Sequence, residues 1–271
     1  MDMNYKKPTI LVPTIMLLLC SCLRGGEGSY RSESAGVTEP DVPAFVYTSE
    51  TSAEQSEPDK PDKTEVIPPK VTPPEPVEAE FPENIDAIIA KHGDSISVHY
   101  TDIANGRTYF WGQDRQYHIA SIVKAPYALY IYRLALEGRA DLGRVYTYEE
   151  RHFIEGTGSI KDAEVGTQFT LEELLNLSLR KSDNIALRII AEQFPSSGYL
   201  EFVKSLGIPH PEDVRNITNG RICVRCAAVY IDAVYNFIEE DNLYSERLGK
   251  HMLSTTNAMI RANHPIARKY G

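Results

Sequence analysis

The sequence lacks three features that would assign it quickly to a class of proteins. It has no surplus of positive charge, with 28 basic against 38 acidic residues, so nothing points to a nucleic-acid partner. Its one CxxC pair, Cys223 and Cys226, has no second pair or histidines nearby, so a metal site has little support. Two helix cysteines are the simpler interpretation, and a local disulfide is the alternative in an oxidising compartment. The apolar run near the N-terminus is too short to predict a membrane span.

The negative charge is concentrated in one stretch, residues 25–80. That stretch holds thirteen acidic and four basic residues, a charge of −9 out of the chain's total of −10. It also holds nine prolines and few large apolar side chains, so it cannot bury enough surface to offset the entropy of ordering. We therefore predict a disordered, acidic linker over residues 23–80.

The N-terminus has the pattern of an export signal. Lys6 and Lys7 precede the apolar run ILVPTIMLLL, and the sequence LCSC follows at residues 19–22. A leucine three residues before a cysteine resembles the bacterial lipobox. The resemblance implies a lipoprotein signal peptide over residues 1–22, with Cys22 lipidated and the protein held by that lipid at the extracytoplasmic face of the membrane. A plain signal peptide and an uncleaved anchor are the alternatives.

The remainder, residues 81–271, has the pattern of an α+β domain. The sequence SISVHYTDIANGRTYFWG alternates on both sides of a turn at residues 104–106, which predicts a β-hairpin. The segment from Ser121 to Leu142 is too continuously apolar for a surface helix, so we expect a central one. Thr170 and Glu173 form a capping box for a further helix. Two helical stretches that meet near residues 181–184 are expected over residues 170–194, and further helices over residues 82–93, 221–240 and 245–260.

Ser121 and Lys124 carry the first chemical signal. Residues three apart share one face of a helix, so the hydroxyl and the amine would lie together at the helix start. A partly desolvated lysine can lose its proton and act as a base for a serine. An SxxK pair also arises by chance, as a capping serine beside a solvated lysine, and Pro126 disturbs the first turns of the helix.

Two more motifs follow in order. The sequence SDN, residues 182–184, begins 61 residues after Ser121, and KYG, residues 269–271, begins 148 residues after it. The series SxxK, SDN and a KTG-like motif resembles class A β-lactamases and penicillin-binding proteins, over residues 81 to 271. The resemblance implies the β-lactamase/transpeptidase-like fold, an antiparallel sheet flanked by a helical block. Either later motif alone could be a turn or a tail.

The resemblance also implies roles for the motif residues. Ser121 would be the acylated nucleophile, with its backbone N–H as half of the oxyanion hole, and Lys124 would be its base. Ser182 would relay a proton toward the leaving nitrogen, and Asp183 would brace the turn.

The substrate-binding residues follow from the same motifs. Asn184 would hold the substrate amide, and Lys269 would attract the substrate carboxylate, with Tyr270 and Gly271 completing the motif. The loop over residues 155–160 would edge the pocket. No metal or organic cofactor is implied.

The chain departs from the family pattern in its deacylation machinery. Class A β-lactamases activate water with a glutamate on an Ω-loop. No ExxLN pattern follows Asn184, and Glu212 and Asp213 are the only acids at a plausible position. We therefore expect a long-lived acyl-enzyme. Tyr270 stands where threonine or serine is usual, which we treat as a mild change.

The second departure concerns the C-terminal part of the family fold. In the family, two further strands and a C-terminal helix follow the KTG-like motif, and the next N–H completes the oxyanion hole. The expectation is an incomplete domain, with the sequence IARKYG unpaired and its backbone groups unsatisfied.

Three functions remain open. The first is a serine hydrolase that acts on β-lactams or related amides. The second is a penicillin-binding or DD-peptidase-like acyltransferase on peptidoglycan-type peptides. The third is a non-catalytic cell-envelope module or an inactive fragment. Serine-type glutaminases also carry SxxK, but the lipobox and the linker disfavour that class.

Overall fold

The computed structural model describes residues 15–20, 77–78, 83–93, 95–103, 106–194, 196–208, 211, 220–256 and 265–270. The chain divides into two units, one of residues 1–22 with 76–271 and one of residues 23–75. The predicted linker lies outside the described residues except for Val77 and Glu78. The predicted Cys22, Gly271, Glu212 and Asp213 also lie outside them. Both the linker and the lipidation at Cys22 stay predictions.

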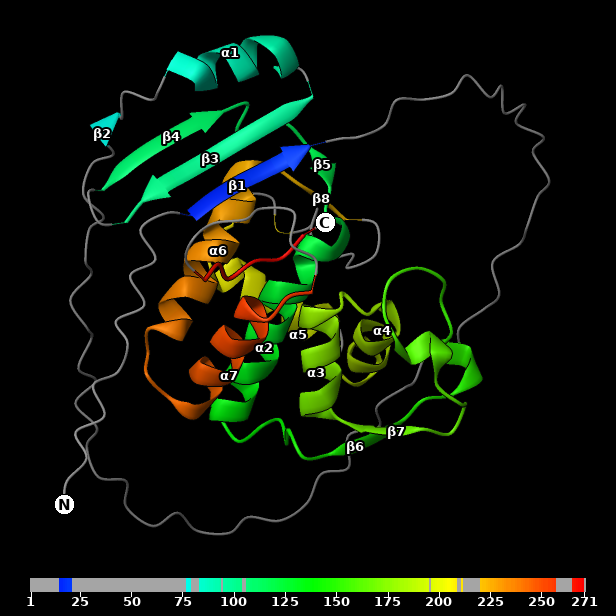
Figure 1. Cartoon of the computed structure of the whole chain (residues 1–271). Coiled ribbons are helices and arrows are strands. Elements are labelled where there is room, and N and C mark those ends of the chain that lie inside the picture. The colour runs from blue at the N-terminus through cyan, green and yellow to red at the C-terminus, as the bar shows by residue number, and fades with distance from the viewer. Residues whose placement is uncertain are drawn as a thin grey trace, which may run out of the picture. The chain divides into compact units, whose positions relative to one another are not determined.

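The main sheet has four strands in the order β1-β3-β4-β2 (Figure 1). The predicted hairpin is confirmed: β3 (Ile96–Asp102) pairs antiparallel with β4 (Arg107–Trp111), with Asp102 opposite Arg107. Gly106 has a φ of 65°, which suits the residue that closes the turn. The short β2 (Val77–Glu78) lies parallel to β4.

The other edge of β3 is covered by β1 (Ile15–Cys20), in an antiparallel register from Ile15 opposite Thr101 to Cys20 opposite Ile96. Residues 15–19 belong to the apolar run of the predicted signal peptide, and Cys20 directly follows that run. The structure therefore gives that run a place in the sheet, and its role in export stays a prediction.

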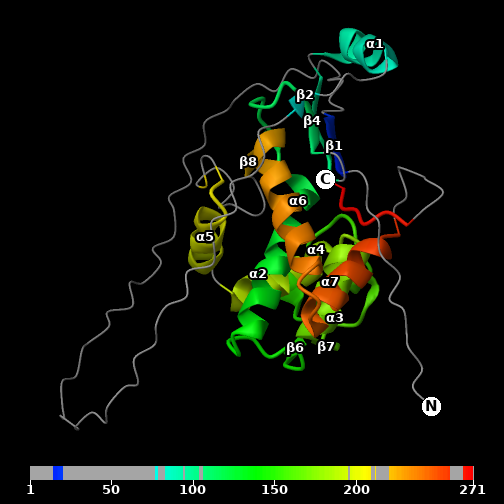
Figure 2. The same ribbon diagram turned by 90° about the vertical axis from the view of Figure 1, so that its left-hand side faces the viewer.

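The helical block is built around α2 (Lys124–Leu136), which is buried along almost its whole length. It packs against α3, α5, α6 and α7, as a central helix should. Figure 2 shows α6 running from the sheet into the block beside α2. The other helices are α1 (Glu83–His92), α3 (Leu171–Arg180), α4 (Asn184–Gln193), α5 (Ser196–Ser205), α6 (Val224–Ile238) and α7 (Leu243–Leu253).

Local sequence determines where these helices begin. The predicted capping box is confirmed, since the Glu173 N–H donates to Thr170 Oγ1 at 3.2 Å and the Thr170 N–H donates to Glu173 Oε2 at 2.7 Å. Asp183 caps α4 by accepting from the N–H groups of Ile185 and Ala186, each at 3.0 Å. Both α3 and α4 therefore begin at a side-chain cap.

Shorter elements complete the domain. Two strand pairs form separate ladders: β5 (Tyr117–His118) with β8 (Arg221–Ile222), and β6 (Val145–Thr147) with β7 (Gln168–Thr170). The 3₁₀ helices are η1 (Ala120–Val123), η2 (Glu150–His152) and η3 (Ile160–Asp162). Among the described helices, none has both the length and the apolarity needed to cross a bilayer.

The segment over residues 265–270 forms no strand. Its backbone was expected to be unpaired, and at Arg268 that expectation is wrong. The Arg268 N–H donates to the Met252 carbonyl at 3.1 Å, and its carbonyl accepts from Thr255 Oγ1 at 2.9 Å. The end of α7 thus satisfies groups that a neighbouring strand would otherwise pair.

Candidate active site

Ser121 and Lys124 lie where η1 passes into α2. Ser121 is half-buried in η1, and Lys124 is the first residue of α2, with only 2% of its surface exposed. Pro126 is tolerated because it falls in the first turn of α2, where a helix has no internal acceptor for the missing N–H. Both residues therefore lie at the start of the buried helix, with a 3₁₀ turn in front of it, and their side chains each contact Ser182 Oγ.

The backbone before Ser121 is held in a strained shape. Ala120 has a φ of 44°, a left-handed conformation that costs a non-glycine residue about 1–3 kcal/mol. The surroundings impose it: the Ala120 N–H donates to His118 Nδ1 at 3.2 Å, and the Ile119 N–H donates to the Gly220 carbonyl at 2.8 Å. The β5–β8 pair therefore sets the position of the nucleophile segment.

Ser182 reaches the same point from the α3–α4 junction. It too is left-handed, with a φ of 53°. Its Oγ donates to Ser121 Oγ at 2.7 Å, which joins residues 61 positions apart. The left-handed residues Ala120 and Ser182 thus hold the two hydroxyls, of Ser121 and Ser182, in contact.

Lys124 is surrounded by acceptors rather than by an acid. Its Nζ donates to the Ser182 carbonyl at 2.5 Å, to Asn184 Oδ1 at 2.7 Å and to Ser182 Oγ at 3.2 Å. Burial lowers the pKa of Lys124 to about 7, and the positive charge of Lys269 adds to the shift against the opposing charge of Asp183. A large fraction of this amine is therefore neutral at neutral pH.

Lys269 is the second amine at Ser182. Its Nζ donates to Ser182 Oγ at 2.9 Å and to the Tyr270 carbonyl at 3.1 Å, and burial lowers the pKa of Lys269 to about 8. The site therefore brings together Ser121, Lys124, Ser182, Asn184 and Lys269, which we call the nucleophile cluster. Of the remaining motif residues, Tyr270 contributes this carbonyl.

Asp183 is fully buried and braces the turn, as its motif implied. Besides its two bonds to α4, its Oδ2 accepts from the N–H groups of Ser159 at 2.6 Å and Ile160 at 2.9 Å. Gly158, with a φ of 126°, lies so close that an added Cβ would be 2.3 Å from the Asp183 carboxyl carbon. One carboxylate thus ties α4 to the loop over residues 155–160.

The same loop holds the other two residues of the SDN motif. Thr157 Oγ1 donates to the Ser182 carbonyl at 2.7 Å, and the Asn184 N–H donates to the Thr157 carbonyl at 3.0 Å. Asn184 Nδ2 donates to the Glu155 carbonyl at 3.4 Å. The loop was expected to edge the pocket, and the contacts of Thr157 and Gly158 with the SDN motif were not expected. The paired glycines of GTGS were the available signal.

The hydrogen bonds within the nucleophile cluster join hydroxyls, amines, an amide and carbonyls. Across the described part of the chain, no ion pair joins Lys124 or Lys269 to a carboxylate. A candidate water-activating acid is therefore not identified among the described residues.

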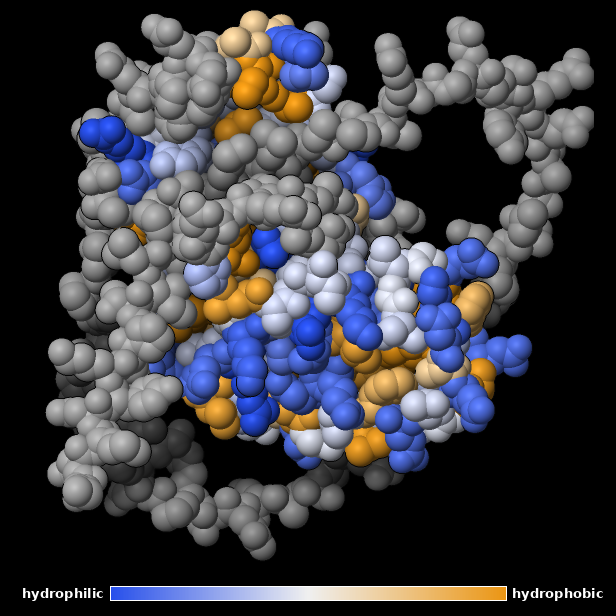
Figure 3. Space-filling view, viewed as in Figure 1, coloured by the Kyte–Doolittle hydropathy of each residue, from blue (hydrophilic) through white to orange (hydrophobic). Residues whose placement is uncertain are grey.

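A second polar cluster lies between α3 and α7, on the largely hydrophilic face seen in Figure 3. Glu172 is at its centre and accepts from Tyr132 Oη at 3.2 Å, with His251 Nε2 at 2.9 Å and Arg247 Nη1 at 3.5 Å. Asn176 Nδ2 lies 3.1 Å from His251 Nδ1. We call these five residues the glutamate cluster. It contains none of the motif residues.

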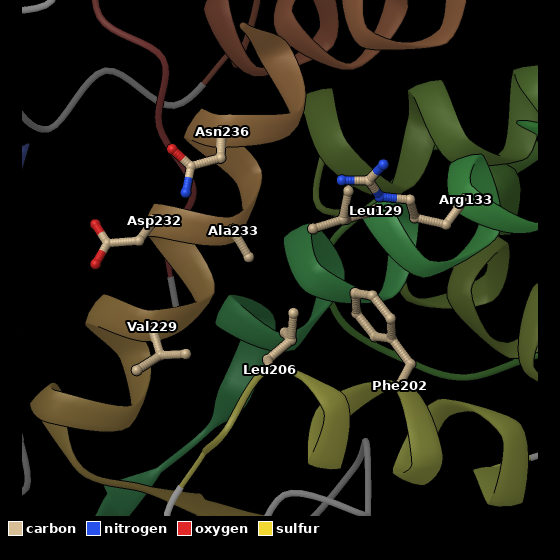
Figure 4. A pocket seen from close by; sticks show the side chains of 8 residues that line it. All are labelled: Leu129, Arg133, Phe202, Leu206, Val229, Asp232, Ala233 and Asn236. Carbon is tan, nitrogen blue, oxygen red and sulfur yellow. The ribbon is translucent and has the colours of Figure 1, made fainter. Parts of the chain in front are cut away.

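A hollow of about 320 Å³ lies between α2, α5 and α6. Figure 4 shows the side chains that line it. Its walls are apolar at Leu129, Phe202 and Val229, and Arg133 and Asp232 stand at its rim. No residue of the nucleophile cluster lines it, so it is separate from the candidate active site.

The sequence of residues 80–271 matches the profile of the family described as the beta-lactamase enzyme family. The chain belongs to the beta-lactamase enzyme family. No curated protein matches the chain. The three motifs that converge on the nucleophile cluster lie within the region matched to this family.

Solved structures agree on the β-lactamase fold. A beta-lactamase from Sphaerobacter thermophilus DSM 20745 is 18% identical, with a TM-score of 0.56, over 64% of this chain and 69% of that one. PBP-A is 16% identical, with a TM-score of 0.57, over 67% of this chain and 72% of that one. A PBP-A mutant in an acyl-enzyme complex with penicillin G is 16% identical, with a TM-score of 0.54, over 64% and 68%. The predicted α+β class and β-lactamase-like fold are therefore confirmed.

Proposed function

We propose that the protein is a serine hydrolase that opens β-lactams or related amides through an acyl-enzyme on Ser121, and that it deacylates slowly. The observation that carries the proposal is the chain of contacts from Ser121 Oγ through Ser182 Oγ to the two lysine amines, over 2.7, 3.2 and 2.9 Å. These distances are those expected between a nucleophile and its base.

The proton would travel along that chain. In the resting site Ser182 donates to Ser121 and accepts from Lys124, so the Ser182 O–H would first turn toward neutral Lys124 Nζ. Ser182 Oγ would then accept the Ser121 proton as Ser121 Oγ bonds to the lactam carbonyl carbon, and Ser182 would pass its own proton to Lys124 Nζ. When the C–N bond breaks, the proton would return through Ser182 to the leaving nitrogen. The product is an ester of Ser121 with the ring opened and no net change in protons.

Electrostatics support the assignment of the two lysines to different roles. Lys124, with its pKa near 7, can be neutral while Lys269, with its pKa near 8, stays charged. Lys269 would attract the substrate carboxylate, and Asn184 would hold the amide while it orients Lys124. The N–H of Ser121, at the start of η1, would donate to the oxyanion.

The contacts of the nucleophile cluster support slow deacylation. Hydrolysis of the ester needs a base that activates water, and the contacts of the nucleophile cluster within the described residues bring no carboxylate to it. A penicillin-binding or DD-peptidase-like acyltransferase is the second candidate. It is favoured by the likeness to PBP-A, which has been solved as an acyl-enzyme with penicillin G. A non-catalytic envelope module is the third.

We also propose that Cys22 carries a lipid that anchors the protein at the extracytoplasmic face of a bacterial membrane. The LCSC sequence and the acidic linker support this proposal. Metabolic labelling with a radioactive fatty acid tests it, with a Cys22→Ser variant as the control. Equal labelling of the two proteins would contradict it.

Intact-mass spectrometry of the purified chain with penicillin G tests the enzymatic proposal, beside a Ser121→Ala control. We expect an adduct of one penicillin on Ser121 that persists for many minutes, and none on the control. Rapid loss of penicillin without an adduct would mean efficient deacylation and would overturn the slow step. A folded protein that gives neither adduct nor turnover would support the non-catalytic module.

A further inference from the structure

Cys223 and Cys226 occupy two linked positions at the start of α6. Cys223 is the N-cap and Cys226 the third residue of the helix, and Cys223 Sγ accepts from the Cys226 N–H at 3.3 Å. The two sulfurs are 2.8 Å apart, and each residue is only 3% exposed. The helix cap therefore holds the two side chains face to face in the protein interior.

A metal does not account for this arrangement. Structural zinc takes four ligands in a tetrahedron, and the described part of the chain has no group of three or more candidate ligands. A disulfide needs sulfurs about 2.0 Å apart, so a shift of about 0.8 Å would close the bond. Helix positions three apart on one face allow that shift through side-chain rotation.

Exchange in the folded protein is hindered. Thiol–disulfide exchange requires a thiolate that an incoming disulfide can reach. Both sulfurs are buried, and burial, with hydrogen bonding to Cys223, raises the pKa of Cys226 to about 12. An incoming disulfide therefore reaches either sulfur more readily before α6 packs against the sheet and α2.

We propose that Cys223 and Cys226 form a disulfide while the chain folds, by exchange with a small-molecule disulfide. Completion of folding then buries the bond and slows further exchange. One cysteine thiolate attacks a sulfur of the small disulfide and releases one thiol. The second cysteine thiolate attacks the mixed disulfide and releases the other thiol. The two cysteines lose two electrons and two protons, and the small disulfide is reduced to two thiols.

The bond would act on the candidate active site through one strand pair. Cys223 directly follows β8, which pairs with β5, and β5 leads through Ile119 and Ala120 to Ser121. Fixing the N-terminus of α6 therefore fixes the strand that positions the nucleophile segment. The proposal does not depend on the catalytic activity.

Trypsin offers a direct test, because Arg225 lies between the two cysteines. The full chain is refolded with oxidised glutathione, blocked with iodoacetamide under denaturing conditions and digested with trypsin. We expect the peptides of residues 222–225 and 226–247 to be joined by a disulfide, and to separate when a reductant is added. Alkylated, separate peptides before reduction would overturn the proposal. The linked peptides also distinguish this bond from any made by Cys20 or Cys22.

A comparison of rates tests whether the folded structure slows formation of the disulfide. The chain refolded with its thiols reduced is exposed to oxidised glutathione, in parallel with the same chain in guanidinium chloride. We expect the linked peptides to form at least tenfold more slowly in the folded protein. Equal rates would overturn the claim that the bond forms during folding. A Cys226→Ser variant is the matched control and should give no linked peptides in either condition.

Discussion

The nucleophile cluster and the glutamate cluster are both partly buried polar networks, but the pKa of the central charged group is shifted by different causes in each. In the glutamate cluster, burial alone would raise the pKa of Glu172, but hydrogen bonds from His251 and Tyr132 and the charge of Arg247 hold it below its usual value. In the nucleophile cluster, burial and the positive charge of Lys269 outweigh the opposing charge of Asp183 and lower the pKa of Lys124 to about 7. Glu172 therefore stays charged at neutral pH, whereas Lys124 can lose its proton there and act as a base.

The largest effect is expected at Lys124. Replacing Lys124 with alanine removes the proposed base, so the rate of Ser121 acylation should fall by about 10²–10⁴. Lys124→Arg should be as slow, because a guanidinium does not deprotonate at these pH values. The measurement is the time course of adduct formation by intact mass. Lys250→Ala, at an exposed lysine beside the glutamate cluster, is the control and should acylate normally. A normal acylation rate in Lys124→Ala would show that Lys124 is not the base for Ser121.

The next effect concerns Asp183, a fully buried acid that directly precedes Asn184 of the nucleophile cluster. Asp183→Ala loses the cap of α4 and leaves the N–H groups of Ser159 and Ile160 buried without their acceptor. We expect the free energy of unfolding to fall by about 3 kcal/mol, the sum of one cap and two unsatisfied donors. Urea denaturation measures it. Asp141→Ala, which removes an exposed contact to the Gly143 N–H, should cost well under 1 kcal/mol.

The acylation rate should depend on the protonation of both lysines of the nucleophile cluster. The rate should rise as Lys124 loses its proton through a pKa of about 7, and fall as Lys269 loses the charge that attracts the substrate above about 8. Lys269→Gln removes a positive charge beside Lys124, so the pKa of Lys124 should rise and the acid limb should move to higher pH. An acid limb that moves to lower pH would contradict the assigned coupling between the two lysines.

Stability should follow pH in the same window. The pKa of Lys124 is lower in the folded protein than in the unfolded chain, so between about 7 and 10.5 the unfolded state binds more protons. The contribution of Lys124 to the free energy of unfolding should therefore rise with pH across that window. The urea midpoint of the wild type, measured relative to that of Lys124→Met, should therefore rise between pH 7 and pH 9. Parallel midpoints would show that the pKa of Lys124 is not lowered.

The smallest effect is expected in the glutamate cluster. Glu172→Gln keeps the size of the side chain but removes the charge, which should cost about 1–2 kcal/mol of stability at neutral pH without changing the acylation rate. The pKa of Glu172 is lowered on folding, so its contribution is present above the unfolded pKa and is lost as pH falls through the folded pKa. The gap between wild type and variant should therefore close in acid. A loss of acylation would show that the two clusters are coupled.

Local patterns predicted the local structure well. The hairpin of β3 and β4, the buried α2 and the Thr170 cap each depend on residues close in sequence, so alternation, apolarity and capping chemistry were sufficient. The three motifs also indicated which residues would meet. Their geometry could not be predicted: Lys124 and Lys269 share one acceptor, Ser182 Oγ, because two distant segments converge on a left-handed residue.

Other features depended on pairing that no local pattern encodes. The backbone of Arg268 finds its partners at the end of α7, a contact set by tertiary packing rather than by strand propensity. The pairing of Ile15–Cys20 with β3 was missed because a continuous apolar run fits a signal peptide as well as it fits a buried strand. The support of the nucleophile segment by β8 likewise needs residues more than a hundred positions away.

The position of β1 links maturation to the exposed surface of the protein. If a signal peptidase cleaved before Cys22, it would remove the strand that pairs with residues 96–101 of β3. The precursor and the processed protein would then differ in the quaternary contacts they can make, because the processed form would present a free strand edge to any chain able to add to it. Processing would thereby act as a trigger for self-association, unless another segment of the mature protein replaced the lost strand.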